Sequence, residues 1–548
     1  MLRAIAPIVL SAAAVVAQTN FPPPPQPASN PSTPAKELLG MALFFEEQLS
    51  STNTVACATC HDFAHGGADP RTNAAINAGA DQIRGTADDQ RGSPGIPLIW
   101  SNGELLPHPA HVFKPNVTTR RAPTIVNTGY HKHLMYDGSK TSLEHLAGAP
   151  LFNPVEMGRS GRTWSEITSK LSSVRPLALA SNLPQRLQTF LGSNNYPALF
   201  QQAFGTTQIS STNITQALAA YIRTLNSDQS KWDRVQNGQA TLTPQEQLGL
   251  TLFNAPANGA TSCNTCHGDF DARTLIEGPV AGQMTMTTSG PYGAFFPTRL
   301  EFHNVGVRPP SEDVGRGGVT LTAADQGKFR VASLRNVALS APYFHNGGMA
   351  TLGDVVEFYN RGGDFHVNQA ANLSPRNYTS VEKDAIVALL NTLTDPRLLA
   401  GTQPFDRPRL GSQNGNIVTA VGTGQTTSAG ELVATAPYAP VLGEPLFRIT
   451  LSGAAPGSLT WLMWDTAAAS TTMPYNLQLA LSPAFQVFGM GPAQTNWIVP
   501  GVGMQQIPMP LPNQPVLAGA ELYAQWLVFD VTSANPILTS NGLRLELQ

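Results

Sequence analysis

Apolar residues recur at helical spacing in two stretches of the chain that are alike. Segments 39–44 and 248–253 both read L-G-x-x-L-F, which places two leucines on one face of a helix. Each segment lies shortly before a pair of cysteines and a histidine, and an Asp-Phe pair follows closely. This weak internal repeat predicts two related helical units.

Helix starts can be placed from capping residues. Thr243 is the expected N-cap of one helix, with Pro244 at its first position and Glu246 closing a capping box. Thr379 and Glu382 predict a second box of the same kind. Apolar stripes predict helices over residues 36–49, with Glu46 at the polar edge, 214–225, 351–360 and 381–393.

Beyond residue 430 the pattern changes from helical to strand-like. Short apolar runs between turn signals predict a β-sandwich over residues 431–548. Gly, Thr, Ser and Gln dominate the preceding segment 401–430, which predicts a linker. The C-terminal part has no Cys and no His, so we assign it no redox chemistry. The clearest runs are Leu446–Leu451, Leu459–Leu462, Glu521–Phe529 and Leu543–Leu547.

Composition narrows the class of protein. Only 13% of the 548 residues are charged and the net charge is -3, so no global field favours nucleic acid or an anionic membrane as a partner. A hydrophobic content of 41% is enough for the cores of several domains. The 48 Gly and 45 Pro residues predict long loops between the elements.

The N-terminus reads as a secretion signal. A short basic start, an apolar run from Ala4 to Val16 and small residues before Gln18 predict a signal peptide over residues 1–17 and a periplasmic or secreted protein. Residues 18–35 are Pro-rich and predict an extended tether. We expect no membrane span in the mature chain, because no apolar run is long enough. An N-terminal membrane anchor is the alternative.

All 4 cysteines fall in two C-x-x-C-H motifs, Cys57–His61 and Cys263–His267. This spacing is the one that attaches c-type haem: the two thiols add to the vinyl groups of one porphyrin, and the next histidine ligates the iron. One zinc site or two disulfides are the alternatives, but zinc leaves the histidines unexplained. The expected ligands of two covalently attached haems are Cys57, Cys60, His61, Cys263, Cys266 and His267.

The sequence therefore predicts a mainly α protein: two cytochrome c-like haem domains with long loops, followed by a C-terminal β-sandwich domain. The expected divisions are the signal peptide 1–17, the tether 18–35, the first haem domain 36–235, the second haem domain 236–400, the linker 401–430 and the β-sandwich accessory domain 431–548.

Further short motifs surround the haem motifs. They are Leu43–Phe45 with Leu49-Ser50, Arg121–Thr124 with Asn127, Tyr136–Gly138, Asn153–Gly158, Phe302–Gly306, Leu334–Val337 and Ala341–Gly347. Each is weak alone. In this order, over Lys36 to Pro396, they resemble the bacterial di-haem cytochrome c peroxidases, including the MauG-type branch.

The resemblance implies a role for each haem. The first, ligated by His61, would be the peroxidatic site, where Glu156 moves a proton between the peroxide oxygens. The second, ligated by His267, would be the electron-transfer haem. Peroxidases of the family use a Met as its other ligand. The MauG-type branch uses a Tyr in an F-Y-N segment before Gly-Gly; Tyr359 matches this pattern, and Met349 is the alternative.

Both assignments have a plainer reading on the residues alone. Glu156 follows Asn-Pro and could simply favour the start of a helix through its charge. Tyr359 could be a buried helix residue with one hydrogen bond. The family pattern favours the catalytic and ligand roles.

Three positions depart from the family pattern. Tyr136 stands where a Trp usually lies between the haems; it is the expected relay for an electron or radical, and its oxidation normally needs loss of its proton. Leu146 replaces a usual Gln of the expected distal pocket. Arg121 replaces an Asn that commonly serves a calcium, which counts against calcium as a cofactor here. These changes bear on turnover more than on haem binding.

The long loop 68–119 holds further candidates. Asp81, Asp88 and Asp89 could ligate calcium, although a solvated loop is the commoner outcome. His108 and His111 could supply a removable ligand to the first haem, as in some family members, although surface or core histidines are commoner.

The expected function is that of an exported di-haem c-type oxidoreductase, a peroxidase that reduces hydrogen peroxide with electrons from a small cytochrome c or a cupredoxin. One rival is MauG-like oxidation of a protein side chain, which the Tyr359 pattern favours. Another is a non-catalytic di-haem electron carrier. We expect His303 and His345, in family motifs, to be structural or to hydrogen-bond near a haem.

Overall fold

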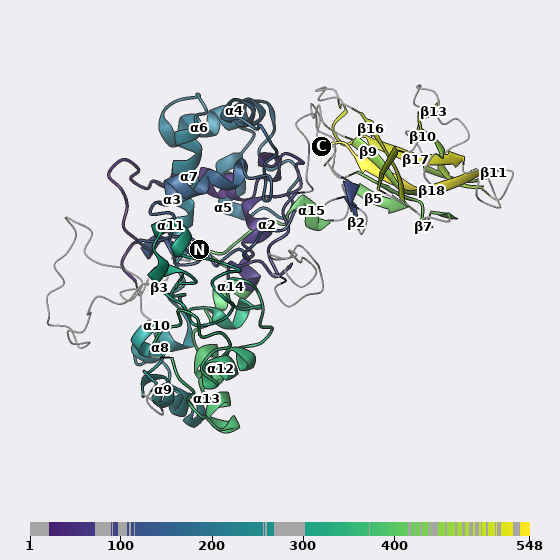
Figure 1. Ribbon diagram of the computed structural model, residues 1–548. Coiled ribbons are helices and arrows are strands. Elements are labelled where there is room, and N and C mark those ends of the chain that lie inside the picture. Colours follow the sequence, from purple (N-terminus) through teal and green to yellow (C-terminus); the bar gives the residue numbers. More distant parts are fainter. Residues whose placement is uncertain are drawn as a thin grey trace, which may run out of the picture.

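The computed structural model has a mainly helical part up to Asn414 and a β-sheet part after it, lying side by side (Figure 1). The structure describes residues 21–71, 89, 91–96, 107–108, 111–113, 116–255, 257, 260–267, 302–371, 373–414, 418–421, 424–427, 430–436, 439, 448–454, 458–465, 468–473, 477–481, 486–487, 493–494, 496–499, 502–509, 511, 517–529 and 537–548. In these ranges no helix has both the length and the apolar character needed to cross a bilayer.

The helices of the described residues are mostly short. They are α1 Pro34–Phe44, α2 Cys57–Cys60, α3 Leu143–Ala147, α4 Trp164–Ser173, α5 Gln185–Leu191, α6 Tyr196–Phe204, α7 Ser211–Thr224, α8 Lys231–Gln236, α9 Pro244–Asn254, α10 Asn264–His267, α11 Gly317–Thr320, α12 Leu352–Asn360, α13 Ser380–Asn391, α14 Pro396–Ala400 and α15 Gly411–Asn414. Long connections join them, as the Gly and Pro content predicts.

The internal repeat of the sequence is also a repeat in packing. α1 lies against α7 and α9 against α13, and each contact is made at the glycine of the L-G-x-x-L-F segment. A Cβ on Gly40 would lie 1.9 Å from the carbonyl oxygen of Ala217, and one on Gly249 would lie 2.0 Å from that of Ala385. Only a residue without a side chain allows this approach of two helix backbones.

Both predicted capping boxes are confirmed. The Glu246 amide donates to the Thr243 hydroxyl at 3.3 Å, and the Thr243 amide donates to the Glu246 carboxylate at 2.7 Å. Thr379 and Glu382 pair in the same way at the start of α13. These local signals identify helix starts because the cap satisfies amides that have no partner within the helix.

The first predicted helix breaks early, and this corrects the position of Glu46. α1 ends at Phe44, and Glu47–Leu49 form a separate 3-10 turn. Glu46, expected at a polar edge, is fully buried; its carboxylate accepts hydrogen bonds from the Tyr196 hydroxyl and the Leu177 amide, both at 2.7 Å. Burial raises the pKa of Glu46. Both partners are remote in sequence, so the helical pattern could not reveal them.

The Pro-rich segment 21–33 has neither helix nor strand, but it is docked rather than free. The Tyr130 hydroxyl donates to the Pro22 carbonyl at 2.6 Å. The Arg335 guanidinium lies over the Phe21 ring, 4.4 Å from its centre. The segment therefore packs on the helical part.

Strands pair antiparallel throughout. In the described part of the chain, two short strand pairs precede Asn414: the hairpin of β1 Pro107–His108 with β2 His111–Phe113, and the pair of β3 Phe302–His303 with β4 Phe329–Arg330, whose strands are far apart in sequence. The strands of the C-terminal part are β5 Val418–Val421, β6 Thr426–Thr427, β7 Gly430–Glu431, β8 Val433–Thr435, β9 Arg448–Ala454, β10 Leu459–Asp465, β11 Ala468–Met473, β12 Leu477–Leu481, β13 Gln486–Val487, β14 Ala493–Gln494, β15 Asn496–Val499, β16 Val502–Pro508, β17 Glu521–Phe529 and β18 Ile537–Glu546.

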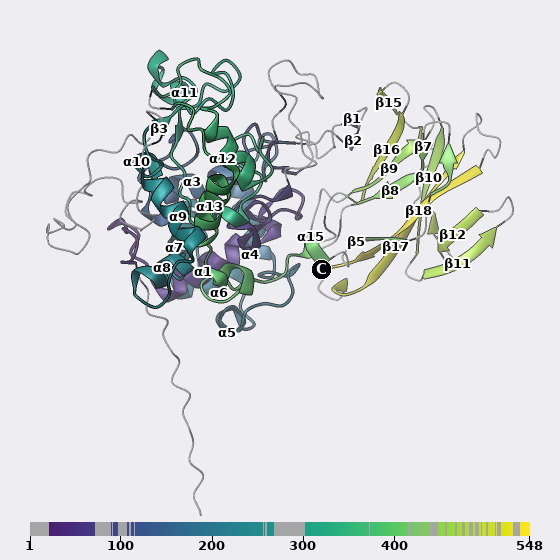
Figure 2. The same cartoon turned by 90° about the horizontal axis from the view of Figure 1, so that it is seen from below.

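Two larger sheets form most of the C-terminal part (Figure 2). One has the order β13-β10-β17-β18-β5, with β14 also paired to β10, and the other has the order β15-β16-β9-β8. Buried side chains of both, such as Ile449 and Leu451 on β9 and Trp526 and Val528 on β17, belong to one apolar core. The two sheets thus share their buried residues.

The segment 401–430, predicted as a linker, is held by specific contacts. The Glu47 carboxylate accepts hydrogen bonds from the amides of Gly411 at 2.6 Å and Ser412 at 3.0 Å. β5 begins at Val418 inside this segment and pairs with β18. Its Gly- and Thr-rich composition suits turns and edge strands as well as linkers, which is why composition alone predicted a linker here.

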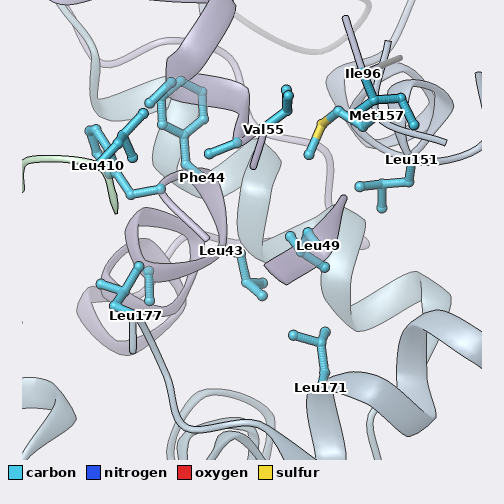
Figure 3. Close-up of a cluster of buried hydrophobic side chains, with 14 of the residues drawn as sticks. Leu43, Phe44, Leu49, Val55, Ile96, Leu151, Met157, Leu171, Leu177 and Leu410 are labelled. Carbon is cyan, nitrogen blue, oxygen red and sulfur yellow. The ribbon is translucent and has the colours of Figure 1, made fainter. Parts of the chain in front are cut away.

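The same segment joins the two parts of the molecule through apolar side chains. The Phe405 ring is fully buried and lies 5.7 Å from the Phe63 ring. Figure 3 shows Leu410 beside Phe44 in the apolar cluster of the first helical unit. That cluster is continuous with the core of the sheets.

Candidate functional site

The first C-x-x-C-H motif forms a single helical turn, α2, that presents His61 at its end. The His61 amide donates to the Cys57 carbonyl at 3.1 Å. The His61 ring is fixed by its Nδ1, which lies 3.2 Å from the carbonyl oxygen of Gly67. Gly67 has φ +76°, and a Cβ there would meet Val126 at 2.9 Å, so this turn requires glycine. The arrangement leaves Nε2 available as a metal ligand.

Both thiols of this motif are unpaired and enclosed. The pKa of Cys57 and of Cys60 is raised to about 12, chiefly by burial, and the nearby charge of Glu156 contributes to both shifts in the same direction. The Arg71 guanidinium donates to Cys60 Sγ at 3.2 Å and is itself paired with Asp69 at 2.8 Å. No sequence pattern reveals Arg71, because its contact with Cys60 depends on where the chain folds back.

Glu156 is brought to this motif by a tight turn and by core packing. The Glu156 amide donates to the Asn153 carbonyl at 3.0 Å, and the Ile96 amide donates to the Glu156 carbonyl at 2.9 Å. The next residue, Met157, is buried with Ile96 and Leu151, as Figure 3 shows. The carboxyl group hydrogen-bonds to the Asn153 side chain, and burial raises its pKa.

The second motif lines a cavity of about 270 Å³. Here too the histidine is held through Nδ1, with His267 Nδ1 3.1 Å from the carbonyl oxygen of Ala332. Cys263 and Cys266 face the same cavity, and Cys266 Sγ lies 3.7 Å from Nε2 of His303. His303 is therefore a neighbour of the second haem motif.

Tyr359 projects from α12 into this cavity. Burial raises its pKa, and the charges of Cys266 and Cys263 act in the same direction. Met349, the alternative ligand, is not among the described residues that line the cavity; it packs at the edge of an apolar cluster, and its carbonyl accepts from the Tyr343 amide at 2.7 Å.

The cavity extends from the second motif toward the first. Ala68, Pro123 and Thr124 line its far end. The Thr124 hydroxyl donates to the carbonyl of Gly66 at 2.6 Å, next to the turn that holds His61. The cavity therefore reaches residues next to the turn that holds His61, although Cys57, Cys60 and His61 are not among the described residues that line it.

Tyr136 lies on this path. It lines the cavity, and the charge of Arg121 acts on its phenol as well as on His61. Burial raises the pKa of Tyr136. The Arg330 amide donates to the Tyr136 carbonyl at 2.7 Å, which ties its backbone to the second half of the helical part.

The residues present fit two haem groups. All 4 cysteines are free of disulfides. In the described part of the chain no three His, Cys, Asp or Glu side chains gather as a metal ion needs, so the alternative of one shared zinc site has no support there. Nε and Nη2 of Arg121 are buried without a hydrogen-bond partner among the described residues. Such donors suit a cofactor that brings its own carboxylates.

Some of the other candidate residues predicted from the sequence lie within the described part of the chain, and others lie outside it. His108 and His111 are paired residues of the β1–β2 hairpin, and their side chains lie outside the described residues. Asp81 and Asp88 also lie outside them. Leu146 packs into a small apolar cluster with Leu134, Leu143, Ala219 and Ile222.

Charged residues not singled out in the sequence connect the two halves. The Arg120 guanidinium pairs with Asp137 at 2.7 Å and with Asp313 at 2.7 Å. His345 lies beside them, its Nε2 4.0 Å from Asp313. No local pattern reveals Arg120 or Asp313, since their partners are up to 193 residues away.

A largely helical chain with two C-x-x-C-H turns, each with its histidine fixed through Nδ1, defines the class of di-haem proteins of the c type. Residues 34–241 match the family model described as "Di-haem cytochrome c peroxidase". The cytochrome-c peroxidase IdrP1 of Denitromonas iodatirespirans is 30% identical over 433 residues, which is 73% of this chain and 96% of that protein. This chain belongs to the di-haem cytochrome c peroxidase family.

Relatives with another name are equally similar. The methylamine utilization protein MauG of Methylophilus methylotrophus is 29% identical over 375 residues, 67% of this chain and 85% of that protein. The crystal structure of a MauG-like protein associated with microbial copper homeostasis superposes with a TM-score of 0.51 at 26% identity, covering 72% of this chain and 99% of that one. The relatives of this chain thus carry both the peroxidase name and the MauG name.

Proposed function

We propose that this protein is an exported peroxidase that reduces hydrogen peroxide at the His61 site with electrons that enter through the His267 site. The observation that carries this proposal is the place of Glu156, a half-buried carboxyl group within electrostatic reach of both thiols of the first motif. Bound haem supplies the redox chemistry that delivers two electrons to the peroxide.

Glu156 is the proton carrier of this proposal. As a carboxylate it takes the proton from one peroxide oxygen, and as an acid it returns that proton to the other oxygen, so that water leaves. Its raised pKa suits a group that must be both base and acid in one cycle. The hydrogen bond from the Ile96 amide and the burial of Met157 hold the backbone of Glu156 in place.

The second site supplies electrons. Tyr359 and His267 would together hold the second haem, because both line one cavity with the two thiols. Tyr136 is the proposed relay between the sites, since it lines the same cavity. The electron donor is a small cytochrome c or a cupredoxin.

The proposal includes the architecture. Residues 1–17 direct export to the periplasm or beyond, and each haem is attached covalently to the two cysteines of its motif. Residues 36–235 and 236–400 form two cytochrome c-like domains, the first peroxidatic and the second for electron transfer. Residues 431–548 form a β-sandwich accessory domain. Calcium is not required in this scheme, because Arg121 supplies a cation between the two sites.

One second function is favoured by a specific observation. An anionic Tyr359 ligand would lower the reduction potential of its haem and stabilise the oxidised states. Oxidation of a protein side chain, the MauG-type alternative, would then replace rapid turnover with a small donor.

Mixing the ferric holoprotein with hydrogen peroxide tests the proposal. An enzyme shows one high-spin haem and reacts rapidly, whereas a pure electron carrier shows two six-coordinate low-spin haems and no reaction. Adding reduced cytochrome c separates the two enzymatic functions. A peroxidase consumes many equivalents of donor, and a side-chain oxidase keeps its oxidising equivalents without the protein substrate.

A further inference from the structure

His345 packs against Tyr136 in the cavity between the two motifs. The two rings are edge to face, with centroids 6.3 Å apart and planes at 68°. Both side chains line the cavity. His345 is fixed from two other sides: its ring stacks on Phe329 at 3.8 Å, and its carbonyl accepts from the Arg121 amide at 2.9 Å. The imidazole is therefore held beside the proposed relay.

The surroundings of Tyr136 oppose a positive charge on its ring. Arg121, Arg330 and Arg120 all lie close enough to act on the phenol electrostatically. Arg121 has the largest of these effects, and a cation beside the phenol disfavours a positive charge on its ring. If Tyr136 loses an electron here, its proton has to leave.

The surroundings of His345 suit a base. Burial lowers its pKa to about 4, so the ring is neutral near pH 7. The charge of Asp313 opposes that shift and Arg120 supports it. Within the described part of the chain, Nε2 of His345 has no hydrogen-bond partner; the Asp313 carboxylate is 4.0 Å away.

Asp313 can stabilise the protonated form of this base. A carboxylate can only accept, so it favours hydrogen on Nε2 and leaves the other ring nitrogen as the acceptor. Once the ring is protonated, its charge faces Asp313, which Arg120 already holds in place at 2.7 Å. A histidine kept only for packing would be expected to have its buried nitrogen bonded.

We propose that His345 accepts the phenol proton of Tyr136 when Tyr136 gives up one electron, and returns it when that electron is replaced. This rests on the proposed function. In the forward step the first site, oxidised by hydrogen peroxide, gains one electron from Tyr136; the O–H bond breaks, leaving a neutral tyrosyl radical and an imidazolium. In the return step an electron from the second site and the proton from His345 restore the phenol.

The test compares His345→Gln with the surface variant His366→Gln in fully haem-loaded protein mixed with hydrogen peroxide. His366 is exposed and bonds to Gln369, away from the cavity. In the parent and in His366→Gln we expect a tyrosyl signal in freeze-quench electron paramagnetic resonance and slower interhaem electron transfer in D₂O. In His345→Gln the transfer slows about 100-fold, with unchanged haem content and ferric spectra.

A second background separates proton transfer from damage to the fold. An oxidised indole keeps its proton far more readily than an oxidised phenol. Adding His345→Gln to Tyr136→Trp should therefore change the rate by less than about 2-fold, whereas a misfolded site would be slow in both backgrounds.

Two results would overturn the proposal in different ways. If the parent reacts with peroxide and His345→Gln transfers electrons as fast as His366→Gln, with the same isotope effect, His345 is not the acceptor. If the parent does not react with peroxide at all, the proposed function fails and this inference fails with it.

Discussion

The same pentapeptide sits in two different surroundings in this molecule. At both sites the histidine Nδ1 is held by a backbone carbonyl, at 3.2 Å for His61 and 3.1 Å for His267. Around His61 the chain adds the carboxyl group of Glu156, and around His267 it adds the phenol of Tyr359 across a cavity. The two motifs are thus alike in how they hold the histidine, while residues from distant parts of the chain make the surroundings of the two sites different.

Removing the cysteines of one motif at a time should have the largest effect, because it removes the haem of one site and leaves the other site intact. We expect Cys57→Ser with Cys60→Ser to abolish the reaction with peroxide, because the peroxidatic haem is lost. Cys263→Ser with Cys266→Ser should keep a reaction with peroxide but lose turnover with a donor. Haem content, measured as the pyridine haemochrome per chain, should fall by half in each; retention of full content would contradict covalent attachment.

Glu156→Gln should leave both haems in place and remove the proton carrier. The expected loss is about 10²–10⁴-fold in the rate of reaction with peroxide, measured by stopped flow. The equivalent change Glu166→Gln, at an exposed carboxylate paired with Arg159, is the matched control. Equal rates in the two variants would show that Glu156 is not the acid–base group.

The pH dependence of the same reaction provides a related test. Glu156 must be ionised to act as the base, and burial raises its pKa. The rate should therefore increase as the pH rises through this pKa, with a midpoint above about 4.3, the ordinary value for Glu. Glu156→Gln should lose that limb of the profile. If the rate of Glu156→Gln still increases with pH in the same way, the increase reports the ionisation of another group.

Tyr359→Met would test which residue is the second ligand at the His267 site. Replacing an anionic ligand by a neutral thioether should raise the reduction potential on the order of 0.1 V or more, within the range of about 0.8 V that axial ligands span. Spectroelectrochemical titration measures this directly. Met349→Leu is the control. A large shift of the reduction potential in Met349→Leu, with no shift in Tyr359→Met, would show that Met349 and not Tyr359 is the ligand.

The smallest expected effect concerns the shared helix packing. Gly40→Ala and Gly249→Ala each force two helices apart, so each should lower the free energy of unfolding by about 1–3 kcal/mol. Gly353→Ala is the matched control: a Cβ there meets only Thr351 Oγ1, at 3.6 Å, and helix propensity favours Ala by up to about 1 kcal/mol. Thermal unfolding followed by circular dichroism measures all three. Similar stability of all three variants would contradict the close contact.

Local sequence signals predicted the features that depend on neighbours in the chain. The capping boxes at Thr243 and Thr379 are present, because each involves residues three positions apart. The repeat around Gly40 and Gly249 is present because two helix backbones approach closely at each of these positions, and only glycine allows that contact. The family was recognisable because its short motifs keep their order along the chain.

Long-range contacts could not be predicted in this way. Glu46 was expected at a polar edge, but Tyr196 and Leu177 accommodate it in the interior. Arg120 meets Asp313 across 193 positions, and nothing near either residue signals the pair. The proposed roles of Glu156, Tyr136 and Tyr359 came from the resemblance and remain predictions for the experiments above.

The anchoring of residues 401–414 affects how the chain can be divided for experiments. Phe405 and Leu410 fill space next to Phe63 and Phe44, and Glu47 binds the first amides of α15. A protein ending at Ala400 would lack Phe405 and Leu410. The apolar space that they fill next to Phe63 and Phe44, close to the turn of the first haem motif, would then be empty. Shortened versions without the sheets should therefore retain the chain to Asn414, and a loss of colour in shorter ones would report a damaged scaffold rather than a missing cofactor ligand.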